Sequence, residues 1–169
     1  MANYKELVPF ILRWEGGFAN DPHDRGGATN RGVTIATFRH YYGSSRTVAD
    51  LRAMTAEQWE HIFLQGYWRP WQAGSIGNQS VADICVDWAW ASGTRTSIKQ
   101  VQRLLAVTAD GIAGSKTLAA IARADQRLLH ARIKAARLAF VERIASRNPP
   151  QKKFIRGWKR RINALCYKA

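Results

Sequence analysis

Long hydrophobic runs are missing from this sequence of 169 residues. A helix that crosses a bilayer needs about 20 consecutive apolar residues, and no segment of the chain has such a run. The N-terminus also lacks a basic region followed by an apolar stretch and a small-residue cleavage site, so we expect no standard secretory signal. The sequence therefore predicts a protein made in the cytoplasm, which reaches an outside target after release or by non-classical export.

Cysteine and histidine are scarce. Cys85 and Cys166 are the only cysteines, and two distant cysteines do not make a disulfide framework. Two buried free thiols are the expected arrangement, although a pair between them stays open. The four histidines show none of the spacings typical of metal ligands: His23, His40, His61 and His130. We therefore expect no metal and no other cofactor, which argues against a zinc-dependent amidase or peptidase.

Acidic residues are sparse in the second half of the chain. Residues 91–169 hold 18 Lys and Arg against 3 Asp and Glu, a net charge of +15, whereas residues 1–90 have a net charge of −1. Such an asymmetry indicates a polyanionic partner for the basic half. Nucleic acid, an anionic membrane and an anionic bacterial envelope all fit this charge.

A carboxylate at the end of the first helix is the first candidate for chemistry. The apolar residues of this helix recur at helical spacing, and Gly16 and Gly17 then end it: Tyr4, Leu7, Val8, Ile11, Leu12 and Trp14. Glu15 is thus expected in the last turn. The partial negative charge of a helix C-terminus and apolar neighbours both favour the protonated carboxylic acid, which is the form that a general acid needs. The alternative is a solvated Glu that merely ends a helix.

The loop after this helix carries a second group of polar side chains. It contains Asp21 and Asp24 within a stretch rich in Gly, Asn and Pro, which is typical of tight turns. Thr29 and Thr34 add hydroxyls at its far end, and Thr34 is a candidate substrate-binding residue. A carboxylic acid, a second carboxylate and a nearby hydroxyl are groups suited to glycoside hydrolysis.

The segment 15–34 reads Glu-Gly-Gly-Phe-Ala-Asn-Asp-Pro-His-Asp-Arg-Gly-Gly-Ala-Thr-Asn-Arg-Gly-Val-Thr. It resembles the catalytic signature of glycoside hydrolase family 108, whose members are lysozyme-like N-acetylmuramidases found among phage endolysins and bacterial cell-wall hydrolases. The resemblance implies Glu15 as the catalytic acid, Asp24 as the second carboxylate and Thr29 as an assisting hydroxyl. The interval from Asp24 to Thr29 is slightly shorter than in phage-type lysozymes, and Asp21 remains the alternative second carboxylate.

Three further positions are expected to bind substrate. Tyr67 and Trp68 match a Tyr-Trp pair of the family, and flat aromatic faces can stack on the apolar faces of sugar rings; packing in the core is the alternative. The segment that begins at Asp87 resembles the family pattern Asp-x-Ala-x-x-x-Gly, with Trp90 where a smaller residue is usual. Because Asp83 lies four residues before Asp87 on one helix face, the two carboxylates repel each other. They therefore need either basic partners or a role in a cleft wall.

The rest of the chain fits the same family. The pattern Val-Gln-x-Leu-Leu…Asp-Gly-x-x-Gly-x-x-Thr in residues 101–117 resembles predicted peptidoglycan-binding modules, so the resemblance covers nearly the whole chain. It implies an all-α, lysozyme-like fold, in which the active loop can carry a small β-hairpin. We expect a catalytic domain at 1–92 and a basic helical region at 93–169 packed against it. Helices are expected near 4–15, 34–42, 48–53, 56–66, 79–92, 95–106, 115–124, 126–147 and 151–166.

The expected activity is hydrolysis of the β-1,4 bond between N-acetylmuramic acid and N-acetylglucosamine in peptidoglycan. We expect a monomer that acts on the cell wall, holds an anionic envelope surface through its basic half and binds no nucleic acid. Two alternatives remain. One is a lytic transglycosylase, which can work with a single Glu, and the other is a non-catalytic basic module that binds envelope or nucleic acid.

Overall fold

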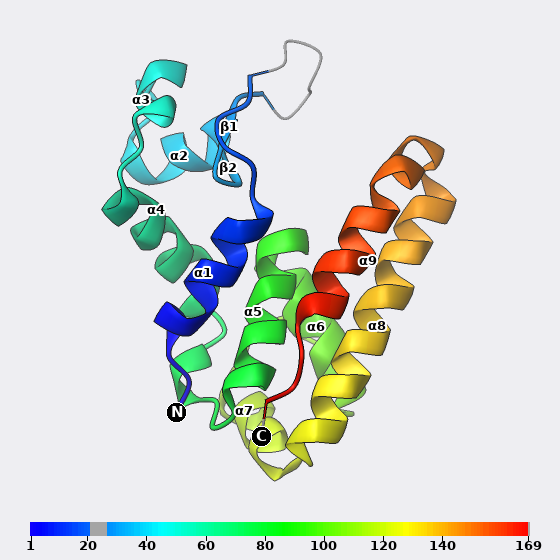
Figure 1. The fold of residues 1–169 in the computed structure, drawn as a ribbon. Helices are drawn as coiled ribbons and strands as arrows, with labels where there is room; N and C mark the ends of the chain where they lie inside the picture. The colour runs from blue at the N-terminus through cyan, green and yellow to red at the C-terminus, as the bar shows by residue number, and fades with distance from the viewer. Residues whose placement is uncertain (21–26, 169) are drawn as a thin grey trace. The chain divides into compact units, whose positions relative to one another are not determined.

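The structure is a computed structural model that describes residues 1–20 and 27–168 (Figure 1). These residues form helices and one two-stranded antiparallel sheet, which confirms the expected all-α class with a small hairpin. The chain divides into two compact units, one of residues 5–66 and one of residues 1–4 together with 67–169. None of the described helices is long and apolar enough to cross a membrane.

The unit of residues 5–66 contains most of the sequence signature. Its elements are α1 (Tyr4–Trp14), β1 (Thr29–Asn30), β2 (Val33–Thr34), α2 (Ile35–Tyr42), α3 (Val48–Arg52) and α4 (Ala56–Phe63). The two expected N-caps are confirmed, because the Thr47 and Thr55 hydroxyls accept the backbone N–H three residues on. Each belongs to a capping box, with Asp50 and Gln58 as the reciprocal partners. These local signals explain why the starts of α3 and α4 can be predicted from sequence.

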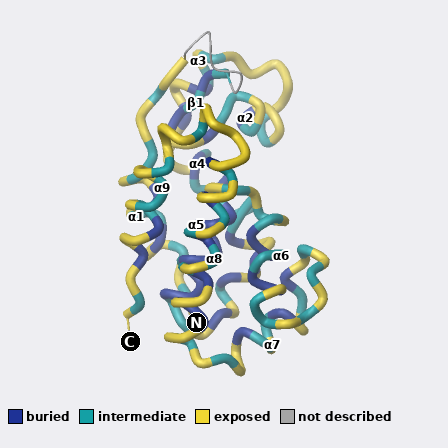
Figure 2. The backbone as a smooth tube through the Cα atoms, turned by 90° about the vertical axis from the view of Figure 1, so that its right-hand side faces the viewer, coloured by how far each residue is buried: buried dark blue, intermediate teal, exposed yellow. Residues whose placement is uncertain are grey.

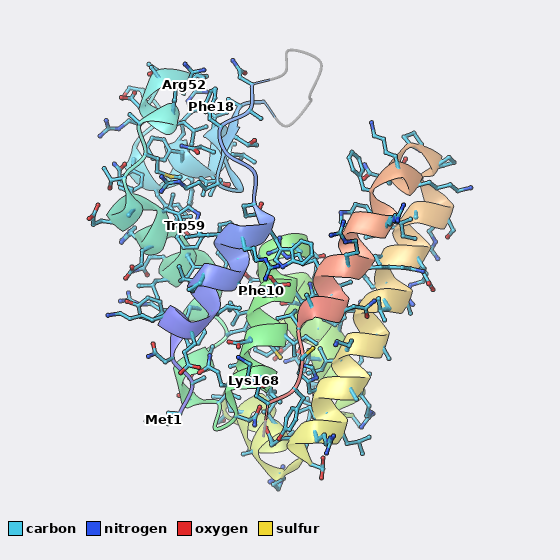
Figure 3. The ribbon with its side chains drawn as sticks, viewed as in Figure 1. Met1, Phe10, Phe18, Arg52, Trp59 and Lys168 are labelled. Atoms are coloured by element: carbon cyan, nitrogen blue, oxygen red, sulfur yellow. The ribbon has the colours of Figure 1, made fainter. Side chains whose placement is uncertain are left out.

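A hydrogen bond from a tryptophan of α4 fixes the hairpin within this unit. Trp59 stacks on Phe63, with ring centroids 5.4 Å apart and an interplanar angle of 7°. The indole N–H of Trp59 donates to the carbonyl of Arg31, at 3.0 Å, and Figure 3 shows Trp59 on α4. The tight turn that presents this carbonyl is thereby fixed to the core of the unit.

The second unit is a helical bundle around α5. It contains η1 (Leu64–Trp68, which begins in the other unit), η2 (Ala73–Ser75), α5 (Gln79–Ser92), α6 (Thr94–Leu104), α7 (Ser115–Arg123), α8 (Gln126–Arg147), η3 (Pro149–Phe154) and α9 (Ile155–Ala164). α5 packs against α6 and α8, and α8 packs against α9 and α7. Buried residues follow one another along α5, whereas most of α9 is exposed or half-buried (Figure 2).

The boundary between the two compact units is distinct from the domain boundary that the sequence predicts. The compact units are divided between residues 66 and 67. The predicted domain boundary at residues 92–93 lies in the turn between α5 and α6 and stays a prediction. Gly93 adopts a φ of 87° in that turn, and α5 and α6 pack directly against each other.

The last expected helix has a different start. α8 ends at Arg147, as the following Asn-Pro-Pro segment predicts. The continuation is the 3-10 helix η3, and the α-helical part begins only at Ile155. Pro149 and Pro150 have no backbone N–H and stand at the first positions of η3, where the missing donors cost little.

Candidate active site

Glu15 directly follows α1. Its backbone N–H donates to the carbonyl of Ile11, at 3.1 Å, so the residue continues the hydrogen-bond pattern of the helix that ends at Trp14. Its side chain is half-buried. Gly16 and Gly17 follow, and neither has a positive φ. The expected position at the helix end is confirmed, although the helix ends without a left-handed glycine.

Two aromatic side chains of α1 contact each other near its end. Phe10 and Trp14 lie with ring centroids 6.1 Å apart. The indole nitrogen of Trp14 is buried and has no hydrogen-bond partner among the described residues. The indole nitrogen of the residue that precedes Glu15 in the sequence is thus shielded from solvent by the described residues.

Thr29 and Thr34 are brought together by the hairpin. They are direct partners in the register of β1 and β2, so their side chains lie on the same face of the sheet. Thr29 also pairs with Ala19, through backbone hydrogen bonds of 2.8 and 2.9 Å. The Thr34 hydroxyl has a structural role as well, since it caps α2 by accepting the N–H of Thr37, at 3.1 Å.

The hairpin turn depends on two residues with positive φ. Arg31 has a φ of 48° and Gly32 a φ of 79°, which is the pattern of a type I′ turn between two short strands. Asn30 fixes the turn to α3. It is buried, and its side-chain amide donates to the carbonyls of Leu51 and Arg52, at 2.8 and 3.2 Å. Sequence reasoning missed this role of Asn30, although the residue belongs to the signature.

The two candidate second carboxylates, Asp21 and Asp24, lie outside the described residues. The described residues before this segment line a hollow of about 390 Å³ together with residues of α3. The lining residues are Phe18, Asn20, Val48, Ala49, Arg52 and Ala53. The Arg52 guanidinium lies 4.3 Å over the Phe18 ring, and Figure 3 labels both side chains. The loop after Glu15 is thus attached to α3 by a cation–π contact.

The Tyr-Trp pair lies in the second unit. Trp68 is only 7% exposed and meets the ring of Tyr4 edge-on, with centroids 6.1 Å apart. This burial agrees with the core interpretation, and a sugar could stack on Trp68 only after the side chain moved. Tyr67 is half-buried and packs against Trp90, with centroids 4.7 Å apart. Trp90, which stands where the family usually has a smaller residue, thus packs against Tyr67.

Asp87 is fully buried on α5. Its carboxylate forms ion pairs with Arg137 of α8, at 2.9 Å, and with Arg161 of α9, at 2.7 Å. Burial lowers the pKa of the Arg137 guanidinium, and the nearby Asp87 opposes this shift. Of the two expectations for Asp87, basic partners are the one found. Direct contact with substrate would require these ion pairs to open, so the residue acts here as a link between three helices.

The motif residues of the basic half form a network of hydrogen bonds around Gln102. The Gln102 amide group donates to Asp110, to the Ile112 carbonyl and to Thr117, at 2.8, 2.9 and 3.1 Å. Its carbonyl oxygen accepts the N–H of Gly111, at 2.9 Å. Gly111 has a φ of 83°, and an added Cβ would come within 2.6 Å of a side-chain carbon of Arg95. These motif residues therefore hold the loop between α6 and α7.

Other chemistry-bearing residues are accounted for by packing. Cys85 is buried and Cys166 exposed, and both are free, so the expectation of a buried thiol is wrong for Cys166. Burial raises the pKa of the Cys85 thiol. Within residues 1–20 and 27–168, no group of three or more His, Cys, Asp and Glu could hold a metal ion. His130 is buried beside Tyr167, with ring centroids 5.7 Å apart.

Comparison with known proteins places this arrangement in a family. The family model described as Glycosyl hydrolase 108 matches residues 8–93, which is more than half of the chain. The chain belongs to the glycosyl hydrolase 108 family. A second family model, described as Predicted Peptidoglycan domain, matches residues 96–163.

A solved structure supports this assignment. The structure of Brucella abortus SagA is similar to this chain, with 28% sequence identity, a TM-score of 0.85, and coverage of 96% of this chain and 90% of that one. No curated protein matches the chain. The glycosyl hydrolase 108 chain is therefore a glycoside hydrolase with a lysozyme-like fold, and its second domain makes it a peptidoglycan hydrolase.

Proposed function

We propose that this glycosyl hydrolase 108 protein is an N-acetylmuramidase in which Glu15 is the catalytic acid. The bond that it cleaves is the β-1,4 bond between N-acetylmuramic acid and N-acetylglucosamine. The observation that carries the proposal is the place of Glu15: half-buried at the end of α1, next to Trp14, within the region matched by the family. A carboxylic acid at this place can give a proton to the oxygen of the leaving group.

The chemistry needs a donor on one side of the bond and a negative group on the other. Glu15 gives its proton to the glycosidic oxygen, and positive charge then develops on the sugar ring that loses the bond. Asp24 is the proposed carboxylate that stabilises this charge or positions a water, with Asp21 as the alternative. Thr29, which the hairpin holds opposite Thr34, assists by orienting that water.

The acid is tested by Glu15→Gln, which keeps the size of the side chain but cannot donate a proton. Turbidity loss of permeabilised cells should fall by about 10²-fold or more, while the thermal unfolding midpoint stays near that of the parent chain. The matched control is Glu6→Gln, an exposed carboxylate on the same helix, which should leave lysis unchanged. Retained lysis in a folded Glu15→Gln protein would remove Glu15 from the mechanism.

The products separate hydrolysis from the transglycosylase alternative. Hydrolysis adds water and leaves a reducing N-acetylmuramic acid end, whereas a lytic transglycosylase leaves a 1,6-anhydro end. Mass spectrometry of digested peptidoglycan distinguishes them by the mass of one water. We expect reducing ends, because a loop with two carboxylates supplies the second group that hydrolysis uses. Loss of activity in Asp24→Asn but not in Asp21→Asn would assign that group.

We further propose that the basic half holds the enzyme on an anionic envelope and that the chain acts on the cell wall as a monomer. The support is the net charge of +15 in residues 91–169, which cleavage of a glycosidic bond does not require. Lysis by a phage or prophage endolysin is the setting that we propose for such an enzyme. In that setting the anionic partner of the basic half is the cell envelope, and we expect no binding to nucleic acid.

A further inference from the structure

The hairpin of α8 and α9 ends in a surface of one charge sign. We define the α8–α9 tip as residues 143–160, which include η3 at the end of the hairpin (Figure 1). This segment has no Asp or Glu and seven Lys and Arg: Arg143, Arg147, Lys152, Lys153, Arg156, Lys159 and Arg160. Among the described residues, the acidic partner found for this set is Glu142, 2.6 Å from Lys159. The tip thus has a high positive charge density.

A large apolar side chain is exposed in the middle of these cations. Phe154 is 46% exposed, and the residues before it from Lys152 back to Ser146 are exposed as well, apart from the half-buried Gln151. The ring stacks on Trp158, with centroids 6.0 Å apart and an interplanar angle of 30°. Exposure of a Phe side chain to water is unfavourable. Because the contact with Trp158 keeps this ring at the surface, the ring is available for transfer into an apolar environment.

The two properties together specify the partner. Cations and an exposed aromatic ring on one surface match a bilayer, whose anionic headgroups lie above hydrocarbon. Nucleic acid is also anionic, but its bases are bound by stacking on aromatic faces. Trp158 lies beside Phe154, and the Lys153 ammonium lies 4.9 Å over the same ring. These two neighbours already contact the ring that a base would stack on, whereas insertion of its exposed part into a bilayer needs no free ring face.

We propose that the α8–α9 tip docks on the surface of an anionic phospholipid bilayer. The lysines and arginines contact the headgroups, and Phe154 enters the boundary between headgroups and acyl chains. The proposal rests on the proposed adsorption to an anionic envelope and names its lipid component as the partner. Binding to lipid needs no bond cleavage, so it can be measured apart from the hydrolase activity.

The test is co-sedimentation of the full chain with vesicles. Vesicles of equal parts phosphatidylglycerol and phosphatidylcholine should bind the protein, and vesicles of phosphatidylcholine alone should not. Phe154→Ala should lower the partition coefficient by about tenfold. The double variant Lys152→Gln/Lys153→Gln should lower it by about thirtyfold. The Phe154→Ala effect should persist at high salt, whereas the effect of the charges should shrink.

Matched controls lie at the end of α7 and at the start of α8, away from the tip. Leu128→Ala removes an apolar side chain that is 60% exposed, and Arg123→Gln/Arg127→Gln removes two exposed charges. Neither should change binding by more than about twofold if the tip is the docking surface. Each variant is first checked for an unchanged unfolding midpoint, and the charge and Phe154 variants probe the tip independently.

Three results would overturn the proposal. The first is equal loss of binding in the tip variants and in the control variants. The second is absence of binding to phosphatidylglycerol vesicles; if permeabilised cells are still lysed, the hydrolase function stands and only the lipid proposal fails. The third is tighter binding to a DNA duplex than to the anionic vesicles, with the same dependence on Phe154, which would make nucleic acid the partner.

Discussion

At the scale of single residues, Asp87 has the most demanding position in the second unit. Its buried carboxylate is placed between two guanidinium groups, so removal of its charge leaves buried cations without compensation. We expect Asp87→Asn to lower the free energy of unfolding by about 3–5 kcal/mol. Denaturant unfolding measures this loss.

The control for Asp87 is an exposed ion pair of the same bundle. Glu142 pairs with Lys159, and both side chains are largely exposed. Exposed pairs contribute about 0–1 kcal/mol, so Glu142→Gln should change stability little. Equal effects of the two variants would mean that burial of Asp87 does not determine its contribution.

His130 predicts a dependence of stability on pH. Burial lowers the pKa of His130 from 6.5 to about 4, with a further contribution from Lys134. Between these two values the unfolded chain binds more protons than the folded one, so stability rises with pH in this window. We expect the free energy of unfolding to fall as the pH drops from about 6.5 towards about 4.

A substitution at His130 checks this dependence. In His130→Phe, the part of the pH dependence due to this group should disappear, and the urea midpoint should change less across the window. His40→Gln, at an exposed histidine, is the control and should leave the pH dependence as it is. An unchanged pH dependence in His130→Phe would assign it to other groups.

At the scale of elements, the loop between α6 and α7 depends on one side chain. The Gln102 side chain forms hydrogen bonds with four residues of this loop and the start of α7: Asp110, Gly111, Ile112 and Thr117. Each buried polar group left without a partner costs about 1–3 kcal/mol. Gln102→Leu should therefore lower the free energy of unfolding by more than the loss of one hydrogen bond would. Gln100→Leu, at a half-buried residue of the same helix, is the control and should lower it less. Hydrogen exchange at Gly111 should accelerate in the first variant and not in the second.

At the scale of the whole molecule, charge should govern adsorption and leave bond cleavage unaffected. Exposed charges act over a Debye length of roughly 10 Å at 0.1 M salt and about 3 Å at 1 M. Activity on whole envelopes should fall steeply with salt, and activity on a short soluble glycan should change little. Replacing Lys152, Lys153, Lys159 and Arg160 by Gln should flatten the first dependence. Arg161 is kept, because it pairs with the buried Asp87. Equal salt sensitivity on both substrates would show that charge acts on the active site or on folding.

The sequence by itself determined the features that depend on near neighbours along the chain. Thr47 and Thr55 bond to backbone three residues away, so the starts of α3 and α4 follow from local pattern. The helix that presents Glu15 is equally local, since it needs only apolar spacing and a break after it. The family signature around Glu15 is also contiguous, which is why the reaction class could be predicted.

Only the tertiary structure decided the features that depend on distant partners. Asp87 meets Arg137 and Arg161, which lie 50 and 74 residues further along the chain, and no local pattern distinguishes this buried link from a cleft wall. The burial of Trp68 likewise depends on partners that the sequence alone does not identify. The reason is physical: hydrogen bonds within a helical turn are fixed by spacing, whereas burial of a charge or a ring depends on which helices pack together.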